Sequence, residues 1–226
     1  MKLSLSEADL SAFVARQLTN LLPDTEISGD QLLLYVQRAI ERAEHCFSRV
    51  SDKYYSKGDQ TRFNHLHTDQ YASFLYLLGN TIFCMDGDLS IATKTYVLNK
   101  ALHGIDVYFE VELPDVFFFQ HPIGTILGRA RYSDFFAVFQ GCTVGGNPEE
   151  EYPRLGKGVV MYGGSAIIGT CTVGHNCWLS MDAVVMNEDL PPNSAIFGRS
   201  PDLVRKPTDR SVLSYFFRTG GEPTVD

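Results

Sequence analysis

Cysteine is scarce in this sequence, and its arrangement excludes two common architectures. The 226 residues include five cysteines, an odd number, and no two of them form a C-x-x-C pair. Neither a disulfide framework nor a zinc site is therefore expected. We interpret the five as small core residues: Cys46, Cys84, Cys142, Cys171 and Cys177.

Positive charge and long apolar runs are also lacking. Lys and Arg number 19 against 27 Asp and Glu, the net charge is -8, and no basic run is present, so nucleic-acid binding is not expected. No stretch approaches the roughly 18 apolar residues of a membrane span, and the start, "MKLSLSEADLSAFVARQ", is typical of an amphipathic helix rather than a signal peptide. With 44% hydrophobic residues, the composition predicts a folded cytoplasmic protein.

Residues 1–104 follow the period of a helix. In "SEADLSAFVARQLTNLL" the apolar residues recur on one face after a candidate N-cap at Ser6, and "QLLLYVQRAIERAEHCF" repeats the pattern. "DQYASFLYLLGNTIF" and "LSIATKTYVLNKALHG" are apolar almost all round, as expected of central or oligomer-facing helices, and Gly104 offers a C-terminal stop. We therefore predict four helices in a helical oligomerisation domain, residues 1–104.

After Gly104 the hydrophobic period changes to six. Aliphatic residues recur at Leu155, Met161, Ile167, Val173, Leu179 and Val185. Mostly small residues stand four positions later, at Val159, Ser165, Cys171, Cys177 and Ala183. A repeat of six is typical of a hexapeptide β-solenoid, in which three hexads complete one triangular coil. The alternative is an ordinary antiparallel sheet whose alternation includes six by chance.

Upstream the repeat is less regular. The positions in two shifted frames are Ile105, Val111, Phe117 and Ile123, then Ile126, Tyr132, Val138 and Val144. The insertion "GNPEEEYPR" interrupts the repeat before Leu155, and we expect it to project from the coil as a substrate-contacting loop. The coil domain is predicted over residues 105–207, followed by a tail over residues 208–226.

The motifs of residues 69–207 resemble serine acetyltransferases, within the left-handed β-helix acyltransferases. The similar stretches are "DQYASFLYLLGN", "TVGG", "GKGVVMYGGSAIIGTCTVGHN", "SAIFGRSPDLVRKP" and an Asp fifteen residues before a His. The resemblance implies an N-terminal helical domain followed by a left-handed parallel β-helix of hexapeptide repeats. It also implies acetyl-CoA as co-substrate without a metal, and assembly into a homotrimer or a dimer of trimers.

His121 and Asp106 stand at the spacing of the catalytic pair in that family. An alcohol is a poor nucleophile at neutral pH, so a base must take its proton as it attacks the thioester, and we assign this role to His121. A carboxylate on the far ring nitrogen fixes the tautomer and stabilises the imidazolium, the role we assign to Asp106. The alternatives are a buried structural histidine and a carboxylate that caps the turn after the last helix.

The resemblance also implies positions for coenzyme A. Small residues are needed where the pantetheine arm passes closest to the coil, and cations are needed at the phosphates. The corresponding positions are Gly146, Gly164, Ser165, Met181, Arg199 and Lys206. Met181 stands where the family prefers Ala, and the glycines serve equally well as turn formers.

The acceptor site departs from the family pattern. Two aspartates that bind the amino group of serine align with His65 and Gln120, and an Arg-His pair that holds its carboxylate aligns with Glu151 and Tyr152. Glu151 would repel a carboxylate, so free serine is not favoured. An uncharged hydroxyl, as in a nucleotide sugar, or an amino alcohol fits better. The sequence does not identify the acceptor.

The tail departs as well. It ends in Asp226, whereas the tail of the family docks into cysteine synthase through a terminal Ile, so this partnership is not expected. Tyr215, Phe216 and Phe217 are expected to pack back on the coil.

Three alternative functions remain open. One is an N- or O-acetyltransferase of a sugar or nucleotide sugar in surface polysaccharide biosynthesis, such as an N-acetyltransferase of an amino-sugar nucleotide. A second is a non-catalytic scaffold of the same fold. A metal enzyme on the same coil is less favoured, because it requires three histidines per site and the coil offers His121 and His175 without supporting spacing.

Overall fold

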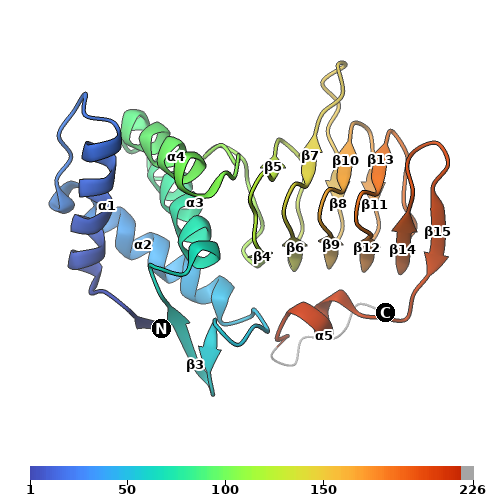
Figure 1. Cartoon of the computed structure of the whole chain (residues 1–226), viewed down its shortest axis with the longest axis horizontal. Coiled ribbons are helices and arrows are strands. Elements are labelled where there is room, and N and C mark those ends of the chain that lie inside the picture. Colours follow the sequence, from blue (N-terminus) through green and yellow to red (C-terminus); the bar gives the residue numbers. More distant parts are fainter. Residues whose placement is uncertain (220–226) are drawn as a thin grey trace.

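The computed structural model describes residues 1–219, and residues 220–226, including Asp226, lie outside the described part. A group of helices stands at one end of the molecule and a stack of short strands at the other (Figure 1). The predicted succession of helices and then parallel strands is therefore observed.

The helical part forms as its periodicity predicts. The helices are α1 (Glu7–Leu21), α2 (Gly29–Phe47), α3 (Thr68–Cys84) and α4 (Leu89–His103). Ser6 caps α1 by accepting a hydrogen bond from Asp9 N–H at 3.1 Å, and Gly104 ends α4 in the left-handed conformation with φ 63°. Fourteen residues of α3 are buried, so this helix is the centre of the group. The prediction of four helices in residues 1–104 is confirmed.

A small sheet within the helical part was not anticipated from the sequence. It consists of β1 (Lys2–Leu3), β2 (Ser56–Lys57) and β3 (Gln60–Phe63) in the order β1-β3-β2. The β2–β3 hairpin turns through Gly58 and Asp59, and Gly58 has the positive φ of 59° that such two-residue turns require. The strands are too short to produce a visible alternation, which explains why the pattern missed them.

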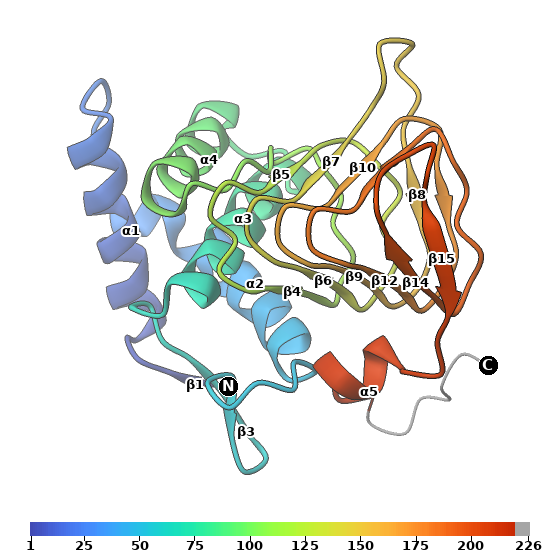
Figure 2. The same cartoon turned by 45° about the vertical axis from the view of Figure 1, so that its right-hand side comes forward.

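The remainder of the chain winds through three parallel sheets in turn. The first sheet holds β4 (Phe117–Phe119), β6 (Phe136–Val138), β9 (Val159–Met161), β12 (Cys177–Leu179), β14 (Ser194–Phe197) and the antiparallel β15 (Val204–Pro207). The second holds β5 (Ile126–Leu127), β7 (Thr143–Gly145), β10 (Ala166–Ile168) and β13 (Val184–Met186). The third pairs β8 (Arg154–Leu155) with β11 (Thr172–Val173). Figure 2 shows the successive turns nested around the coil.

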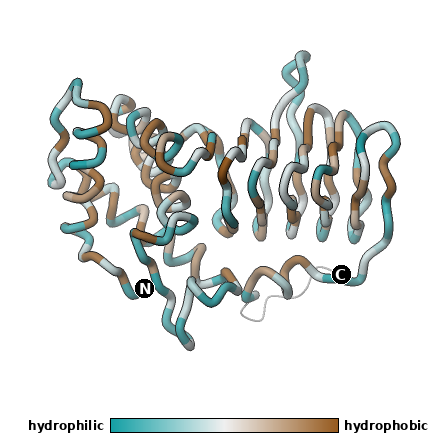
Figure 3. The backbone as a smooth tube through the Cα atoms, in the orientation of Figure 1, coloured by the Kyte–Doolittle hydropathy of each residue, from teal (hydrophilic) through white to brown (hydrophobic). Residues whose placement is uncertain are grey.

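The six-residue repeat fills the interior of this coil. All six predicted aliphatic positions from Leu155 to Val185 are at most 3% exposed, and the five positions four residues later are at most 2% exposed. Strand register stacks equivalent hexads, so that Val160 pairs with Trp178 and Ile167 with Val185. The loop between β7 and β8 projects from the stack and is hydrophilic (Figure 3). The interior predicted for the regular repeat is confirmed.

Three predicted core positions are wrong. Ile123 and Ile126 are 68% and 47% exposed, because the turn after β4 shifts the frame and places Thr125 and Leu127 inside instead. Cys84, at the end of α3, is exposed, whereas the other four cysteines are buried.

The tail packs back on the coil, as predicted, through two of its three aromatic residues, Phe216 and Phe217. In α5 (Val212–Phe216) the Phe216 ring lies against Phe139 and Trp178, and Phe217 is buried against Phe135. Tyr215 touches the edge of the Trp178 ring but is 64% exposed. The helix lies beside the coil in Figure 1.

Replacing Phe216 with Ala should destabilise the protein by about 3 kcal/mol, since a buried ring is lost and the cavity it leaves closes only in part. The adjacent Tyr215→Ala is the matched control, with an expected cost under about 1 kcal/mol because its ring is mostly in water. Urea unfolding followed by circular dichroism measures both. Equal losses for the two variants would contradict the packing of α5.

Candidate functional site

His121 lies in the first turn of the coil. It follows β4 and begins the "HPIG" turn, in which Gly124 N–H donates to Gly104 O at 2.9 Å. Its φ of 50° lies in the left-handed region, which costs a non-glycine residue roughly 1–3 kcal/mol and is often found at functional sites. The side chain is 77% exposed. The ring therefore faces solvent and is not a buried structural histidine.

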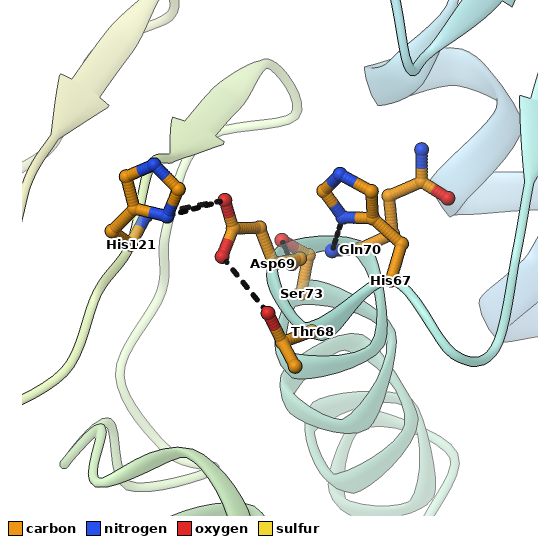
Figure 4. Close-up of polar contacts among 6 residues, drawn as sticks. All are labelled: His67, Thr68, Asp69, Gln70, Ser73 and His121. Atoms are coloured by element: carbon orange, nitrogen blue, oxygen red, sulfur yellow. Dashed lines mark hydrogen bonds and ion pairs between the residues drawn. The ribbon is translucent and has the colours of Figure 1, made fainter.

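A buried carboxylate from the helical part holds this turn. Asp69, in the first turn of α3, has a side chain only 7% exposed. Its Oδ2 accepts a hydrogen bond from the backbone N–H of His121 at 3.1 Å and lies 3.7 Å from Nδ1 of the same residue. Thr68 Oγ1 donates to Oδ1 at 3.4 Å (Figure 4). Because a helix N-terminus favours negative charge, the start of α3 is a suitable place for this carboxylate.

A cavity of about 300 Å³ opens beside this pair. Its lining consists of Thr68, Asp69, Leu102, His103, His121, Pro122, Ile123 and Gln140. The lining contains apolar, hydroxyl, amide and imidazole groups and one carboxylate, and it includes neither Lys nor Arg from the described chain. The cavity therefore offers a base and an anion but no cation.

His103 is a second histidine of this cavity. It is the last residue of α4, and its Nδ1 lies 2.8 Å from Oδ1 of Asn99. Burial lowers the pKa of His103, although the charge of Asp69 and the contact with Asn99 act in the opposite direction. His103 is therefore held towards its neutral form next to the exposed His121.

The predicted pairing of Asp106 with His121 is not formed within the chain. The Asp106 carboxylate accepts hydrogen bonds from Tyr96 Oη at 2.7 Å and from Lys100 Nζ at 2.6 Å. Burial raises the pKa of Asp106, but these two donors outweigh it and hold the pKa below the ordinary value. The reason is register: Asp106 pairs with Ile126 in the next turn of the coil, five residues beyond His121. Within the chain, the carboxylate beside the His121 ring is instead that of Asp69, 3.7 Å from Nδ1.

Neither His65 nor Gln120 lines the cavity. His65 Nδ1 lies 2.8 Å from Ser4 Oγ, and its ring packs edge-on against Phe13, so the side chain holds the N-terminal segment. The backbone of Gln120 donates to Val138 O at 2.9 Å, while Gln140, one turn along the coil, lines the cavity instead. Within the single chain these two residues lie outside the lining of the cavity, and their role in an acceptor site stays a prediction.

Glu151 and Tyr152 lie in the projecting loop, away from the lining of the cavity. Glu151 Oε2 accepts hydrogen bonds from Thr170 Oγ1 and Asn147 Nδ2, and these bonds lower the pKa of this exposed carboxyl. The Tyr152 ring covers Gly146 so closely that a Cβ there would lie 2.8 Å from it. The close approach of the Tyr152 ring therefore explains why a glycine stands at position 146, without reference to a ligand.

The remaining positions predicted for coenzyme A divide into buried and exposed groups. Ser165 is fully buried, with its Oγ 3.6 Å from Cys142 Sγ, so its side chain faces the interior, and its role towards coenzyme A stays a prediction. Gly164 forms a coil turn with φ 75°, and a Cβ would lie 2.3 Å from Asp182 Oδ1. Met181, Arg199 and Lys206 are exposed. Turn geometry thus explains Gly164, and three of the six predicted positions present their side chains to solvent.

Asp69 and His103 were missed by the sequence reasoning. A carboxylate in the first turn of a helix is ordinarily interpreted as a partner of the helix dipole, and a histidine at the last position is equally ordinary. The six-residue repeat carries no information on which helix end touches the coil. No signal in the single sequence distinguishes these two residues.

The part of the chain that the structure describes contains no group of three His, Cys, Asp or Glu side chains able to hold a metal ion. The helices of residues 1–219 include none long and apolar enough to cross a membrane.

The fold and site together define a class of protein: a helical domain joined to a three-sided parallel β-coil of hexapeptide repeats, with a solvent-facing histidine at the junction. The solved structures with this fold include the serine acetyltransferase of Vibrio cholerae, with a TM-score of 0.69 over 92% of this chain and 83% of that chain, at 17% identity. They also include the serine acetyltransferase of Brucella abortus in complex with coenzyme A, with a TM-score of 0.68 over 92% and 84%, at 16% identity. Identities this low establish the fold alone.

In sequence, the chain is similar to serine acetyltransferases. It is 25% identical over 144 residues to that of Staphylococcus xylosus, covering 59% of this chain and 66% of the relative. It is 24% identical over 107 residues to that of Salmonella typhimurium, covering 46% and 39%. The chain thus spans less than two thirds of the curated relatives that it matches. No protein-family model matches the chain. The resemblance inferred from the motifs is confirmed.

The buried His103 should make folding stability depend on pH. Its pKa is lowered in the folded protein, so below its ordinary value of about 6.5 the unfolded chain binds the proton first, and stability falls as the pH falls. His103→Gln should therefore lose less stability than wild type between about pH 7.5 and about pH 5.5. Urea midpoints at the two pH values measure the effect, with the exposed His45→Gln as control. An unchanged pH dependence in His103→Gln would contradict the neutral buried imidazole.

Proposed function

We propose that the protein is an acetyl-CoA-dependent O-acetyltransferase in which His121 is the base. The observation that carries this proposal is the solvent-facing imidazole at a cavity, fixed to a buried carboxylate through its own backbone. The similarity to serine acetyltransferases, one of which is solved with coenzyme A, supports the choice of acyl transfer and of the donor.

The chemistry follows from the different surroundings of the two nitrogens of the His121 ring. Nδ1 faces Asp69, so Nε2 is the nitrogen that takes the proton of the acceptor hydroxyl. The oxygen attacks the thioester carbonyl, the carbon–sulfur bond breaks, and the imidazolium returns its proton to the departing thiolate. The charge of Asp69 favours the imidazolium that exists between these two proton transfers.

The cavity favours an acceptor without a carboxylate. A carboxylate group requires a cation or several donors, and this chain supplies no Lys or Arg to the lining of the cavity. Asp69 would in addition repel it. An amino alcohol or a sugar hydroxyl meets the apolar surface of Leu102 and Ile123 without that penalty. We therefore propose an acceptor other than free serine, although the relatives are named for serine.

The proposed site is completed by a second chain. We infer a left-handed coil and a homotrimer or dimer of trimers, in which Asp106 of one chain approaches the His121 turn of its neighbour. The exposed Met181, Arg199 and Lys206 are then available to coenzyme A in the groove between chains. The same assembly brings the loop with Glu151 and Tyr152 towards an acceptor on the adjacent chain.

Two other functions have less support. An N-acetyltransferase of an amino-sugar nucleotide uses the same base and donor, and analysis of the product as amide or ester separates it from the proposal. A non-catalytic scaffold does not explain why the exposed His121 ring lines a cavity beside a buried carboxylate. Thermal shift with coenzyme A distinguishes the scaffold, which would show no stabilisation.

Replacing His121 with Ala should lower the rate of acetylation between about 100-fold and about 10,000-fold, because the acceptor loses its general base. Thiol release from acetyl-CoA measures the rate with serine, homoserine, amino alcohols and nucleotide sugars as acceptors. The exposed His45→Ala is the matched control and should keep the wild-type rate. A His121→Ala variant that acetylates every responsive acceptor as fast as wild type would refute the assignment.

Two substitutions at Asp69 separate its charge from its hydrogen bond. Asp69→Asn keeps an oxygen that accepts from the His121 N–H but removes the charge, so kcat should fall about tenfold while the acceptor KM is unchanged. Asp69→Ala removes both and should be slower still. A raised KM with wild-type kcat in Asp69→Asn would show instead that Asp69 binds the acceptor.

A further inference from the structure

A second cavity, about 360 Å³ in volume, lies on the helical part of the molecule. It is lined by residues of β1, of β3 and of the segment that leads into α3. Three of its lining residues are cations, Lys2, Lys53 and Arg62, and none of its lining residues is acidic. The chain as a whole has a net charge of -8, whereas the lining of this cavity is positively charged.

The strand register places two of these cations side by side. β1 pairs with β3 in parallel, with Lys2 opposite Arg62 and Leu3 opposite Phe63. Residues in register point to the same face of a sheet, so Lys2 and Arg62 share a face. Like charges directly opposite each other destabilise a strand pair. The pairing is therefore unfavourable unless an anion lies between the two cations.

The protein does not supply that anion. Within residues 1–219, no carboxylate forms an ion pair with Lys2, Lys53 or Arg62. Nε of Arg62 is buried and has no hydrogen-bond partner in the described chain. Lys53 Nζ lies over the Tyr54 ring at 4.9 Å, which leaves its N–H groups available. The three cations therefore line the cavity without a carboxylate of the described chain to balance their charge.

His67 adds an imidazole donor to the same cavity. Its Nδ1 accepts the N–H of Gln70 at 3.4 Å at the start of α3, which leaves Nε2 as the ring nitrogen that can donate. Figure 4 shows the rings of His67 and His121 on opposite sides of Asp69. The cationic cavity is therefore distinct from the cavity at His121, and the two share no lining residue.

We propose that this cationic cavity binds a phosphate dianion, either inorganic phosphate or the phosphomonoester of a small metabolite. Three cations exceed the charge of a single carboxylate and match a dianion, and the guanidinium fork of Arg62 fits phosphate oxygens. The volume lies within the roughly 300–1,000 Å³ of small-molecule sites, which leaves room for a group attached to the phosphate.

Isothermal titration calorimetry of the full-length protein, without acetyl-CoA, tests the proposal. The probes are inorganic phosphate and glucose 6-phosphate, with glucose as the uncharged control. Both anions should bind, and Arg62→Gln and Lys53→Gln should each weaken binding at least about tenfold. Lys57→Gln is the matched control, because Lys57 lies in the same hairpin outside the cavity, and it should stay within about twofold of wild type.

Thermal unfolding of Lys2→Gln provides an independent readout. Without an anion, this variant should melt no lower than wild type, because the like-charge pair with Arg62 is relieved. With phosphate present, it should gain less than wild type does. Binding of phosphate and glucose 6-phosphate with equal affinity identifies the phosphate group alone as the ligand, and tighter binding of the sugar phosphate identifies a phosphomonoester.

The absence of binding of either anion to wild type up to about 10 mM would overturn the proposal. An equal loss of affinity in Lys57→Gln and Arg62→Gln would do the same, since it would show general charge attraction rather than a site. If Arg62→Gln fails to fold, Lys53→Gln decides, because Lys53 lies on a loop outside the strand pair.

Discussion

The contact between the carboxylate of Asp69 and the backbone of His121 is the constraint on which the candidate site depends. It joins residues 52 apart in the sequence, one at the start of the central helix and one in the first turn of the coil. The same carboxylate fixes the position of the turn and sets the charge beside the ring. Because Asp69 is almost fully buried, its charge is screened by water less than that of a surface carboxylate.

The coil supplies the rigidity that makes this contact specific. Each turn stacks on the next through parallel strands, and its interior is closed by one aliphatic residue per hexad. Left-handed φ values recur at the turns, including Gly124, Gly141, Gly164 and Asp182. The His121 turn begins this series, so a rigid stack supports it from one side and α3 holds it from the other. A catalytic group gains most when its surroundings are fixed in this way.

The regular parts of the fold could be predicted from the sequence because in each of them the hydrophobic pattern repeats several times. Four helices and the stacked hexads from Leu155 to Val185 were of this kind. The prediction failed where the frame shifts, at Ile123 and Ile126, and where strands are only two to four residues long, as in the sheet of β1, β2 and β3. His121 was singled out through its motif, whereas the neighbouring Asp69 was not. Neither the helical period nor the six-residue period indicates which helix end contacts the coil.

The position of Asp106 follows from the length of a coil turn. Regular turns repeat every 17 or 18 residues, as in the pairing of Val160 with Trp178 and of Trp178 with Ala195. A spacing of fifteen is shorter than these repeats, and Asp106 pairs with Ile126 rather than with His121. Within the chain, the residues near His121 are instead Leu102 and His103. Within one chain, the carboxylate that lies beside the His121 ring is therefore that of Asp69, 3.7 Å from Nδ1, and not that of Asp106.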